Sequence, residues 1–200
     1  PDVVYNRYLS NRDSLDTRSI TGRLGIYGVR SFNTSLGSKL EVYEHLKQHP
    51  ETAQYLPETV ILDALPTLAF MLERHGEVYV KTLNGHLGKN IVRISETRRG
   101  YLVKKTGDKM GKYYSTIARA YQDLGWAKGA GRLIVQQSII SPGRDTHFDV
   151  RVLMQKDRHN QWQFTGAAAR LGRKGMITTN LHTGGSACKL ARVLASNGFS

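Results

Sequence analysis

Alternating apolar and polar residues on both sides of a glycine-containing loop predict a β-hairpin in the middle of the chain. Residues 78–81 place two valines on one face of a strand and a tyrosine and Lys81 on the other, because side chains alternate with a period of two. A second β-type run, residues 91–94, follows the loop that contains Gly85 and Gly88. The pattern predicts strand, loop and strand, with a lysine where the first strand ends.

The same alternation, or a short apolar run, predicts strands at residues 3–5, 101–105, 132–140, 148–155 and 161–170. Gln136 and Gln137 interrupt one of these runs, and they are either edge positions or a polar seam between two lobes. Asp149 and Arg151 share the polar face of another. They form either a surface ion pair worth under about 1 kcal/mol or a charge pair that faces a cleft.

Apolar residues with a helical period predict helices between these strands. The residues expected at helix ends are Ser38, Ser115 and Ser186 at starts and Gly76 and Gly125 at stops. Ser38 also forms a capping-box pattern with Glu41. Residues 1–34 show one strand and a loose connection. A few helices among meandering strands predict an α/β (α+β) fold in two layers.

The charge of the chain favours polyanionic partners such as nucleotides, nucleic acid or an acidic surface. There are 29 Lys and Arg against 16 Asp and Glu, which gives a net charge of +13. Aromatic residues make up 8% of the chain and do not alternate with basic residues as base-stacking platforms would, which argues against nucleic acid.

Cys188 is the only cysteine, so an intrachain disulfide and a cysteine-based zinc site are excluded. No apolar run approaches the roughly 20 residues that a membrane helix needs.

The loop that follows Lys81 has the local chemistry of a phosphate site. Glycines without side chains let backbone N–H groups approach an anion, and a nearby ammonium supplies the opposite charge. No Gly-Lys-Ser/Thr follows, so the loop is not a Walker A motif, and its spacing excludes a dinucleotide-binding fingerprint. Taken alone, the loop is better explained as a hairpin with a solvated lysine. His45 and His49, one helical turn apart, lack a third metal ligand and are better explained as solvated histidines.

Eight segments in chain order resemble the YheC/YheD family of endospore coat-associated ATP-grasp proteins. The segments are PDVVYNR, KLEVYEHL, YLPET, VYVKTLNGHLGKNIVRI, IVQQSI, FDVRVLMQK, TGAAARLG and TTNLHTGGSA. The resemblance covers nearly the whole chain, and the asparagine-leucine-histidine stretch in the last segment is also similar to RimK-type ligases. It implies a two-lobe ATP-grasp architecture, with residues 1–54 carrying the first strand, a connection and the first helix. Residues 55–134 would be the small lobe with a glycine-rich lid, and residues 135–200 the hinge and part of the large lobe.

The resemblance also implies a nucleotide held between the lobes. Its cofactor-binding residues would be Lys39 and Lys81 at the phosphates, Gly85 and Gly88 in the lid, Gln136, Gln137 and Ile139 at the adenine hinge, and Asp149, Arg151 and Asn180 along the site. Arg170 would be catalytic by stabilising phosphoryl charge. In such enzymes ATP phosphorylates a carboxylate, an amine attacks the acyl phosphate, and Mg²⁺ offsets the phosphate charge.

One departure from the family concerns the metal. ATP-grasp ligases hold Mg²⁺ with an Asp and a Glu-x-Asn pair after the last helix, but no Glu follows Glu96 and no Asp follows Asp157. The chain is therefore expected to contain no metal ligand and to be a piece of a longer protein that supplies these residues beyond Ser200, so that the architecture stops before its C-terminal metal-binding strands.

We predict an ATP-binding ATP-grasp domain of a carboxylate–amine ligase-like protein that takes part in sporulation. Its partners would be adenine nucleotide and spore-coat proteins, in the mother-cell cytoplasm or at the endospore coat. The alternatives are a non-catalytic structural coat protein and a basic protein that binds nucleic acid or another polyanion.

Overall fold

The computed structural model describes residues 2–5, 14–32, 37–84, 90–129, 131–139 and 147–198. The chain divides into two compact units, Pro1–Val42 and Tyr43–Ser200. The predicted lobe boundaries after residues 54 and 134 stay a prediction.

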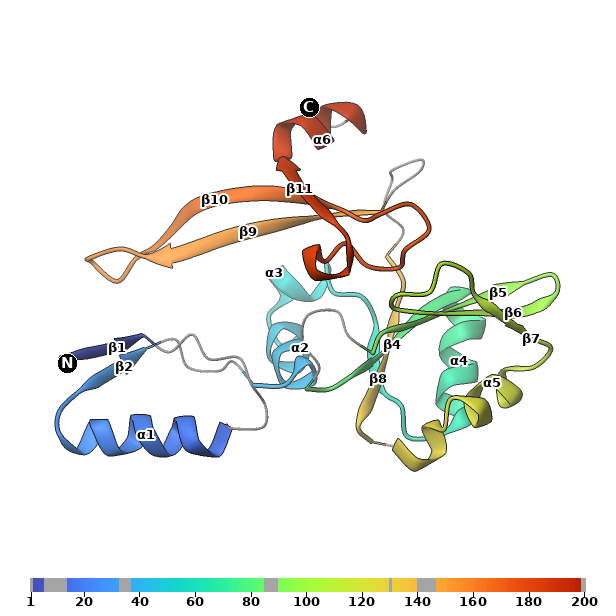
Figure 1. Ribbon diagram of the computed structural model, residues 1–200, viewed down its shortest axis with the longest axis horizontal. Helices are drawn as coiled ribbons and strands as arrows, with labels where there is room; N and C mark the ends of the chain where they lie inside the picture. Colours follow the sequence, from blue (N-terminus) through green and yellow to red (C-terminus); the bar gives the residue numbers. More distant parts are fainter. Residues whose placement is uncertain are drawn as a thin grey trace. The chain divides into compact units, whose positions relative to one another are not determined.

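The first unit contains a small parallel pair of strands. β1 (Val3–Tyr5) lies beside β2 (Arg30–Phe32), and α1 (Ser14–Ile26) connects them (Figure 1). Parallel strands need such a crossover, because a tight turn cannot reverse the chain twice. The sequence predicted only a loose connection here. α1 contains two glycines, and each glycine lowers the stability of a helix by about 1 kcal/mol relative to alanine. Helix propensity therefore does not indicate this helix.

The capping box predicted at the start of the next helix is confirmed. The backbone N–H of Ser38 donates to Glu41 Oε2 over 2.6 Å, and the N–H of Glu41 donates to Ser38 Oγ over 3.3 Å. α2 (Lys39–Lys47) follows at once. A short α3 (Pro50–Ala53) comes next and begins on a proline, which suits the first turn because that position needs no N–H donor.

The second unit contains a six-stranded antiparallel sheet with the order β3-β8-β4-β5-β6-β7. Its strands are β3 (Thr59–Ile61), β4 (Glu77–Thr82), β5 (Val92–Thr97), β6 (Gly100–Lys105), β7 (Lys112–Tyr114) and β8 (Leu133–Gln137). The hairpin predicted from the alternation is confirmed, with Val78 opposite Ile94 and Val80 opposite Val92. β8 lies between β3 and β4, so Gln136 is not at an edge of the sheet.

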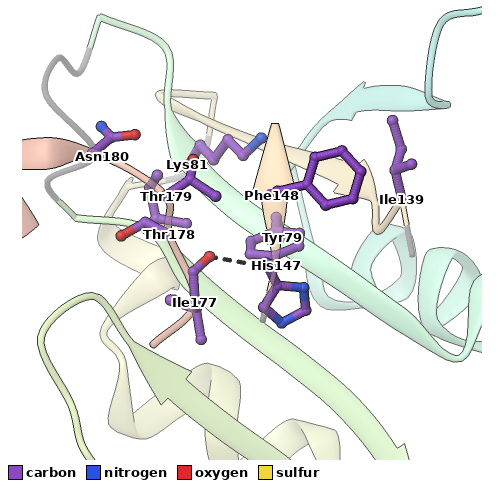
Figure 2. A pocket seen from close by; sticks show the side chains of 10 residues that line it. Tyr79, Lys81, Ile139, His147, Phe148, Ile177, Thr178, Thr179 and Asn180 are labelled. Carbon is purple, nitrogen blue, oxygen red and sulfur yellow. Dashed lines mark hydrogen bonds between the residues drawn. The ribbon is translucent and has the colours of Figure 1, made fainter. Parts of the chain in front are cut away.

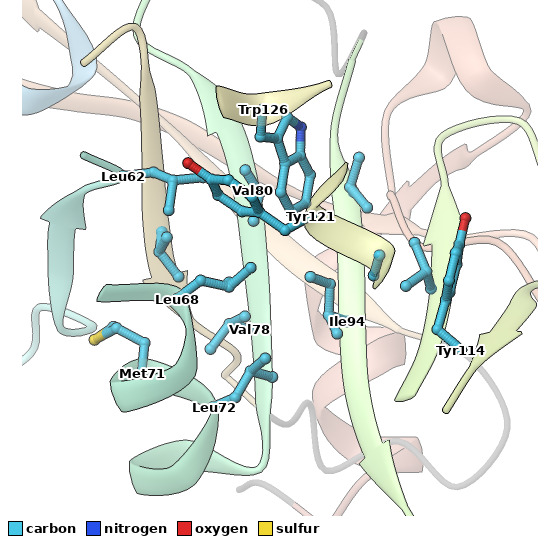
Figure 3. Packing of buried hydrophobic residues seen from close by; sticks show 14 residues of the cluster. Leu62, Leu68, Met71, Leu72, Val78, Val80, Ile94, Tyr114, Tyr121 and Trp126 are labelled. Carbon is cyan, nitrogen blue, oxygen red and sulfur yellow. The ribbon is translucent and has the colours of Figure 1, made fainter. Parts of the chain in front are cut away.

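The apolar face of this sheet forms the core with two helices and a 3₁₀ turn (Figure 3). The covering elements are α4 (Leu65–His75), α5 (Ile117–Asp123) and η1 (Trp126–Gly129). Leu68 of α4 is fully buried. Gly76 ends α4 in the left-handed region with φ of 66°, as predicted. The start of α5 is one residue later than predicted: its cap is Thr116, whose hydroxyl accepts from the N–H of Arg119.

A three-stranded antiparallel sheet with the order β11-β10-β9 completes the second unit. Its strands are β9 (Phe148–Lys156), β10 (Trp162–Leu171) and β11 (Ser186–Lys189). The 3₁₀ turn η2 (Leu181–Thr183) lies between β10 and β11, and α6 (Leu190–Ser196) follows β11. The prediction that Ser186 caps a helix is wrong. Ser186 starts a strand that pairs with the end of β10, and the helix begins four residues later with Lys189 as its cap.

The mixed α/β class predicted from the sequence is confirmed. Across the described ranges, no helix has the length and apolar character needed to cross a bilayer.

Candidate functional site

A hollow of about 200 Å³ lies between β4 and the connection from β10 to β11 (Figure 2). Its walls come from four separate parts of the chain: β4, the residue before β5, the described residues at the two ends of the β8–β9 connection, and the residues before η2. The lining residues are Tyr79, Lys81, Ile91, Ile139, His147, Phe148, Ile177, Thr178, Thr179 and Asn180. The hollow therefore combines one ammonium group, several apolar side chains and a run of polar ones.

A chain of hydrogen bonds across three strands orients Lys81. Its Nζ donates to Gln136 Oε1 on the neighbouring β8. The Gln136 amide donates to Thr59 Oγ1 on β3 over 2.8 Å, and the Thr59 hydroxyl donates to the carbonyl of Pro57 over 2.9 Å. Because the Thr59 proton is used in this way, its oxygen must accept, and this fixes which way the amide of Gln136 faces.

The other hinge candidates have different surroundings. Gln137 holds β8 to the segment before β3: its N–H donates to the carbonyl of Glu58 over 2.8 Å, and its Oε1 accepts from the N–H of Glu58 over 3.1 Å. Ile139 lines the hollow and is 67% exposed. Of the two, only Ile139 offers surface to a bound molecule in the hollow.

Asp149 and Arg170 form a cross-strand ion pair beside the hollow. The two residues are direct partners in the β9–β10 register, and Arg170 Nε and Nη2 each lie 2.7 Å from a different oxygen of Asp149. The hydroxyl of Thr179, in the wall of the hollow, also donates to Asp149. Burial alone would raise the pKa of Asp149, but the bonds from Arg170 and Thr179 and the charges of Arg170 and Arg151 outweigh it and lower this pKa.

The polar wall of the hollow, which runs from Ile177 to Asn180, is held in place by hydrogen bonds to the residues that follow it. Thr178 is buried, and its hydroxyl lies 2.7 Å from that of Thr183. The carbonyl of Asn180 accepts from the N–H of Gly185 over 3.1 Å and from the hydroxyl of Thr183 over 2.9 Å. A Cβ on Gly185 would come within 2.8 Å of the carbonyl carbon of Thr179. This close approach requires glycine at that position.

The structure brings part of the predicted set together. Lys81, Ile139 and Asn180 line one hollow, Gln136 is bonded to Lys81, and Asp149 is bonded to the wall through Thr179 while it holds Arg170. Arg151 is exposed on β9 opposite Ala168, and the described ion pair of Asp149 is with Arg170 instead.

Three predicted site residues cannot be placed relative to the hollow. Gly85 and Gly88 fall outside the described residues. Lys39 belongs to the first unit, where partial burial lowers its pKa. Their roles in the site stay predictions.

Sequence reasoning missed several lining residues. Tyr79 could have been found, because it shares a strand face with Lys81 at a spacing of two. Burial raises the pKa of its hydroxyl. His147, which lines the hollow, and Thr59, which bonds Gln136 without lining it, carry no local signal, since their place depends on how distant strands pair.

The described residues do not fit a magnesium ion. No group of three His, Cys, Asp or Glu side chains converges within the described ranges. Both oxygens of Asp149, which is beside the hollow, are already bound by Arg170. Mg²⁺ requires near-octahedral oxygen ligation with one or two carboxylates available, and this donor set does not provide it.

Comparison with known proteins identifies the class of protein that this fold and site define. Residues 28–198 match the family model described as "YheC/D like ATP-grasp". The chain is therefore an ATP-grasp protein, and it belongs to the YheC/D-like ATP-grasp family, as predicted from the eight segments.

Two curated relatives come from Bacillus subtilis (strain 168). The chain is 30% identical to the endospore coat-associated protein YheD over 96% of this chain and 44% of that protein. It is 24% identical to the endospore coat-associated protein YheC over 94% of this chain and 53% of that protein. The chain spans about half the length of these relatives. Among solved structures, ATP-grasp ligase PsnB complexed with minimal precursor is 13% identical, with a TM-score of 0.41, over 86% of this chain and 56% of that chain.

Proposed function

We propose that this chain binds ATP in the hollow beside β4, with the phosphates at Lys81 and the adenine toward Ile139. The observation that carries the proposal is that Lys81, Ile139 and Asn180, three residues separated by much of the sequence, line the same hollow. Membership of an ATP-grasp family supports adenine nucleotide as the ligand.

The composition of the walls suits the two ends of a nucleotide. Ile91, Phe148 and Ile177 give apolar surface for a planar base, while the ammonium of Lys81 gives charge for a phosphate. The excess of 29 basic over 16 acidic residues would raise the local concentration of such an anion. Asn180 can donate or accept one further bond at the polar wall.

For the complete protein we propose carboxylate–amine ligation. A substrate carboxylate oxygen would attack the γ-phosphorus, ADP would leave, and an amine would then displace phosphate from the acyl carbon. No step is assigned here to a metal, because the described residues do not fit one. Arg170 would stabilise charge on the transferred group and, through Asp149, keep Thr179 in place.

We also propose that the protein acts in sporulation, in the mother cell or at the spore coat, with coat proteins as partners. The names of the two Bacillus relatives support this setting. The finding that would oppose it is production of the protein only in growing, non-sporulating cells.

Thermal unfolding with and without millimolar ATP tests nucleotide binding. Wild-type protein should unfold at a higher temperature with ATP, because a ligand that binds the native state stabilises it. Lys81→Ala should lose most of this shift. Lys105→Ala, at an exposed lysine on β6, should keep it. An absent shift in the wild type, or an equal shift in Lys81→Ala, contradicts the proposal.

The net charge of +13 favours one second candidate, a polyanion-binding protein. Such binding would weaken steeply with salt, because each neutralised phosphate releases counterions. A salt titration of binding to short single-stranded DNA separates the two functions. Strong, salt-sensitive DNA binding that ATP does not compete with would favour this candidate over a nucleotide site.

A further inference from the structure

Lys104 on β6 is a buried lysine in the second unit. It is 8% exposed, while the next residue, Lys105, is exposed. Burying an ammonium is costly unless it is hydrogen-bonded or paired. Within the described part of the chain, no carboxylate lies at salt-bridge distance from it. Its acceptors are instead two main-chain carbonyls, of Lys109 over 3.0 Å and of Gly175.

The register of the six-stranded sheet places Lys104 in a polar row on the face opposite the apolar core. Directly paired residues, strand by strand, are Thr59, Gln136, Tyr79, Arg93 and Lys104. Neighbouring pairs such as Val78 and Ile94 are buried in the core instead. The row therefore lies on the side of the sheet that carries the hollow.

Three consecutive members of this row contact the segments that build the other side of the hollow. Tyr79 donates its hydroxyl to the carbonyl of Ile177 over 3.4 Å (Figure 2). Arg93 Nη1 lies 3.4 Å from His147 Nε2. Lys104 bonds the carbonyl of Gly175. Among these contacts, only that of Lys104 joins a buried charge to the main chain.

Gly175 belongs to the turn that leads into the polar wall. The turn closes with a bond of 2.9 Å from the N–H of Met176 to the carbonyl of Arg173, and Gly175 has φ of 79°. The residues that line the hollow begin two positions later, at Ile177. A shift of the Gly175 carbonyl would be passed along this short segment to Thr179 and Asn180.

We propose that Lys104 is a positioning residue of the nucleotide site, one that fixes the Arg173–Met176 turn against β6 and so sets the place of the wall from Ile177 to Asn180. The proposal rests on the proposed function for its ligand. Lys104 itself does not line the hollow. It acts through the main chain, because its buried ammonium donates to the carbonyl of Gly175 as well as to that of Lys109.

The test combines amide hydrogen exchange with ATP titration on Lys104→Met. Exchange in the peptide covering residues 176–180 should become faster without any nucleotide present, while exchange in α4 stays unchanged. The affinity for ATP should fall about 10-fold, because small misplacements of a binding group are costly. Lys105→Met is the matched control, since it removes the neighbouring exposed lysine, and it should change neither readout.

Conservative variants keep the test informative if Lys104→Met folds poorly. Lys104→Arg retains several donors and should restore both readouts, and Lys104→Gln should restore them in part. Unchanged exchange at residues 176–180 in a folded Lys104→Met overturns the proposal. So does faster exchange spread evenly over both sheets, which would indicate a merely structural role.

The two proposals fail in different ways. If wild-type protein does not bind ATP but Lys104→Met loosens residues 176–180 alone, the positioning role stands and the nucleotide function falls. If wild-type protein binds ATP and Lys104→Met binds it equally well, the nucleotide function stands and the positioning role falls.

Discussion

Lys81 and Gln136, which lie on adjacent strands and are 55 positions apart in sequence, are joined by a hydrogen bond from the ammonium of the lysine to the amide oxygen of the glutamine. The amide is oriented in turn by the buried hydroxyl of Thr59. The lysine at the hollow is thus oriented by a neutral acceptor that is itself fixed by the neighbouring strands.

Thr59→Val should weaken ATP binding several-fold while leaving the fold intact. Valine has the shape of threonine but cannot accept from Gln136, and losing one such bond is worth about 1 kcal/mol, or roughly 5-fold in affinity. Titration of the variant with ATP measures the change. Thr59→Ser keeps the hydroxyl and should bind as the wild type does. Equal affinities for all three proteins would show that this chain of hydrogen bonds does not orient Lys81.

Asp149→Asn should lower the melting temperature at neutral pH, with a difference from wild type that shrinks in acid. The pKa of Asp149 is lowered in the folded protein, so its stabilisation is present above the ordinary value of 3.8 and is lost as pH falls through the folded value. Solvent reduces the effect, because the side chain is 39% exposed.

Melting curves of wild type and Asp149→Asn from pH 7 to pH 3 provide the measurement. Asp108→Asn, at an aspartate outside the Arg170 pair, serves as the control for general acid denaturation. A difference between wild type and Asp149→Asn that stays constant over this range would mean that the ion pair with Arg170 contributes no pH-dependent stability.

Gly185→Ala should disturb the polar wall and reduce ATP affinity. The added Cβ would lie 2.8 Å from the carbonyl carbon of Thr179 and 3.0 Å from the carbonyl oxygen of Asn180, so that backbone has to move. Gly166→Ala in β10 is the control, because its Cβ would meet nothing within 4 Å. Titration of both with ATP decides the matter, and equal affinities would count against a wall fixed by Gly185.

Leu68→Ala should cost about 2–5 kcal/mol of unfolding free energy, as deletions of fully buried leucine side chains do. Leu68 is at 0% exposure on the core face of α4. Phe70→Ala on the same helix should cost much less, because Phe70 is 53% exposed. Urea denaturation of the two variants gives the comparison, and similar losses would show that α4 does not pack as described.

Sequence patterns correctly predicted the elements that are specified by residues close together in the chain. Alternation gave the β4–β5 hairpin and β9, and the glycine at position 76 gave the end of α4. The missed elements depend on distant partners. β1 was predicted, but its parallel partner β2 and the helix with two glycines that connects them were not, and Ser186 lies in a strand only because the end of β10 is beside it.

The same limit applies to the site residues, because those whose partners are distant in the chain were not predicted. Lys81 and Asn180 were assigned to the site from the resemblance to ATP-grasp proteins, because the strand and glycine loop around Lys81, taken alone, indicated only a hairpin with a solvated lysine. The partner of Asp149 was not predicted, because Arg151 is two residues away whereas Arg170 becomes its neighbour only through the β9–β10 register. Thr59 and Lys104 were missed for the same reason, since each acts on a residue far away in the chain.

Photoaffinity labelling with an azido-adenine analogue of ATP, followed by peptide mapping, tests most directly whether ATP occupies this hollow. The account predicts covalent label in peptides that contain Tyr79, Ile139 or residues 177–180, with labelling suppressed by excess ATP and lost in Lys81→Ala. Label confined to peptides away from the hollow, or label that excess ATP does not suppress, would contradict it.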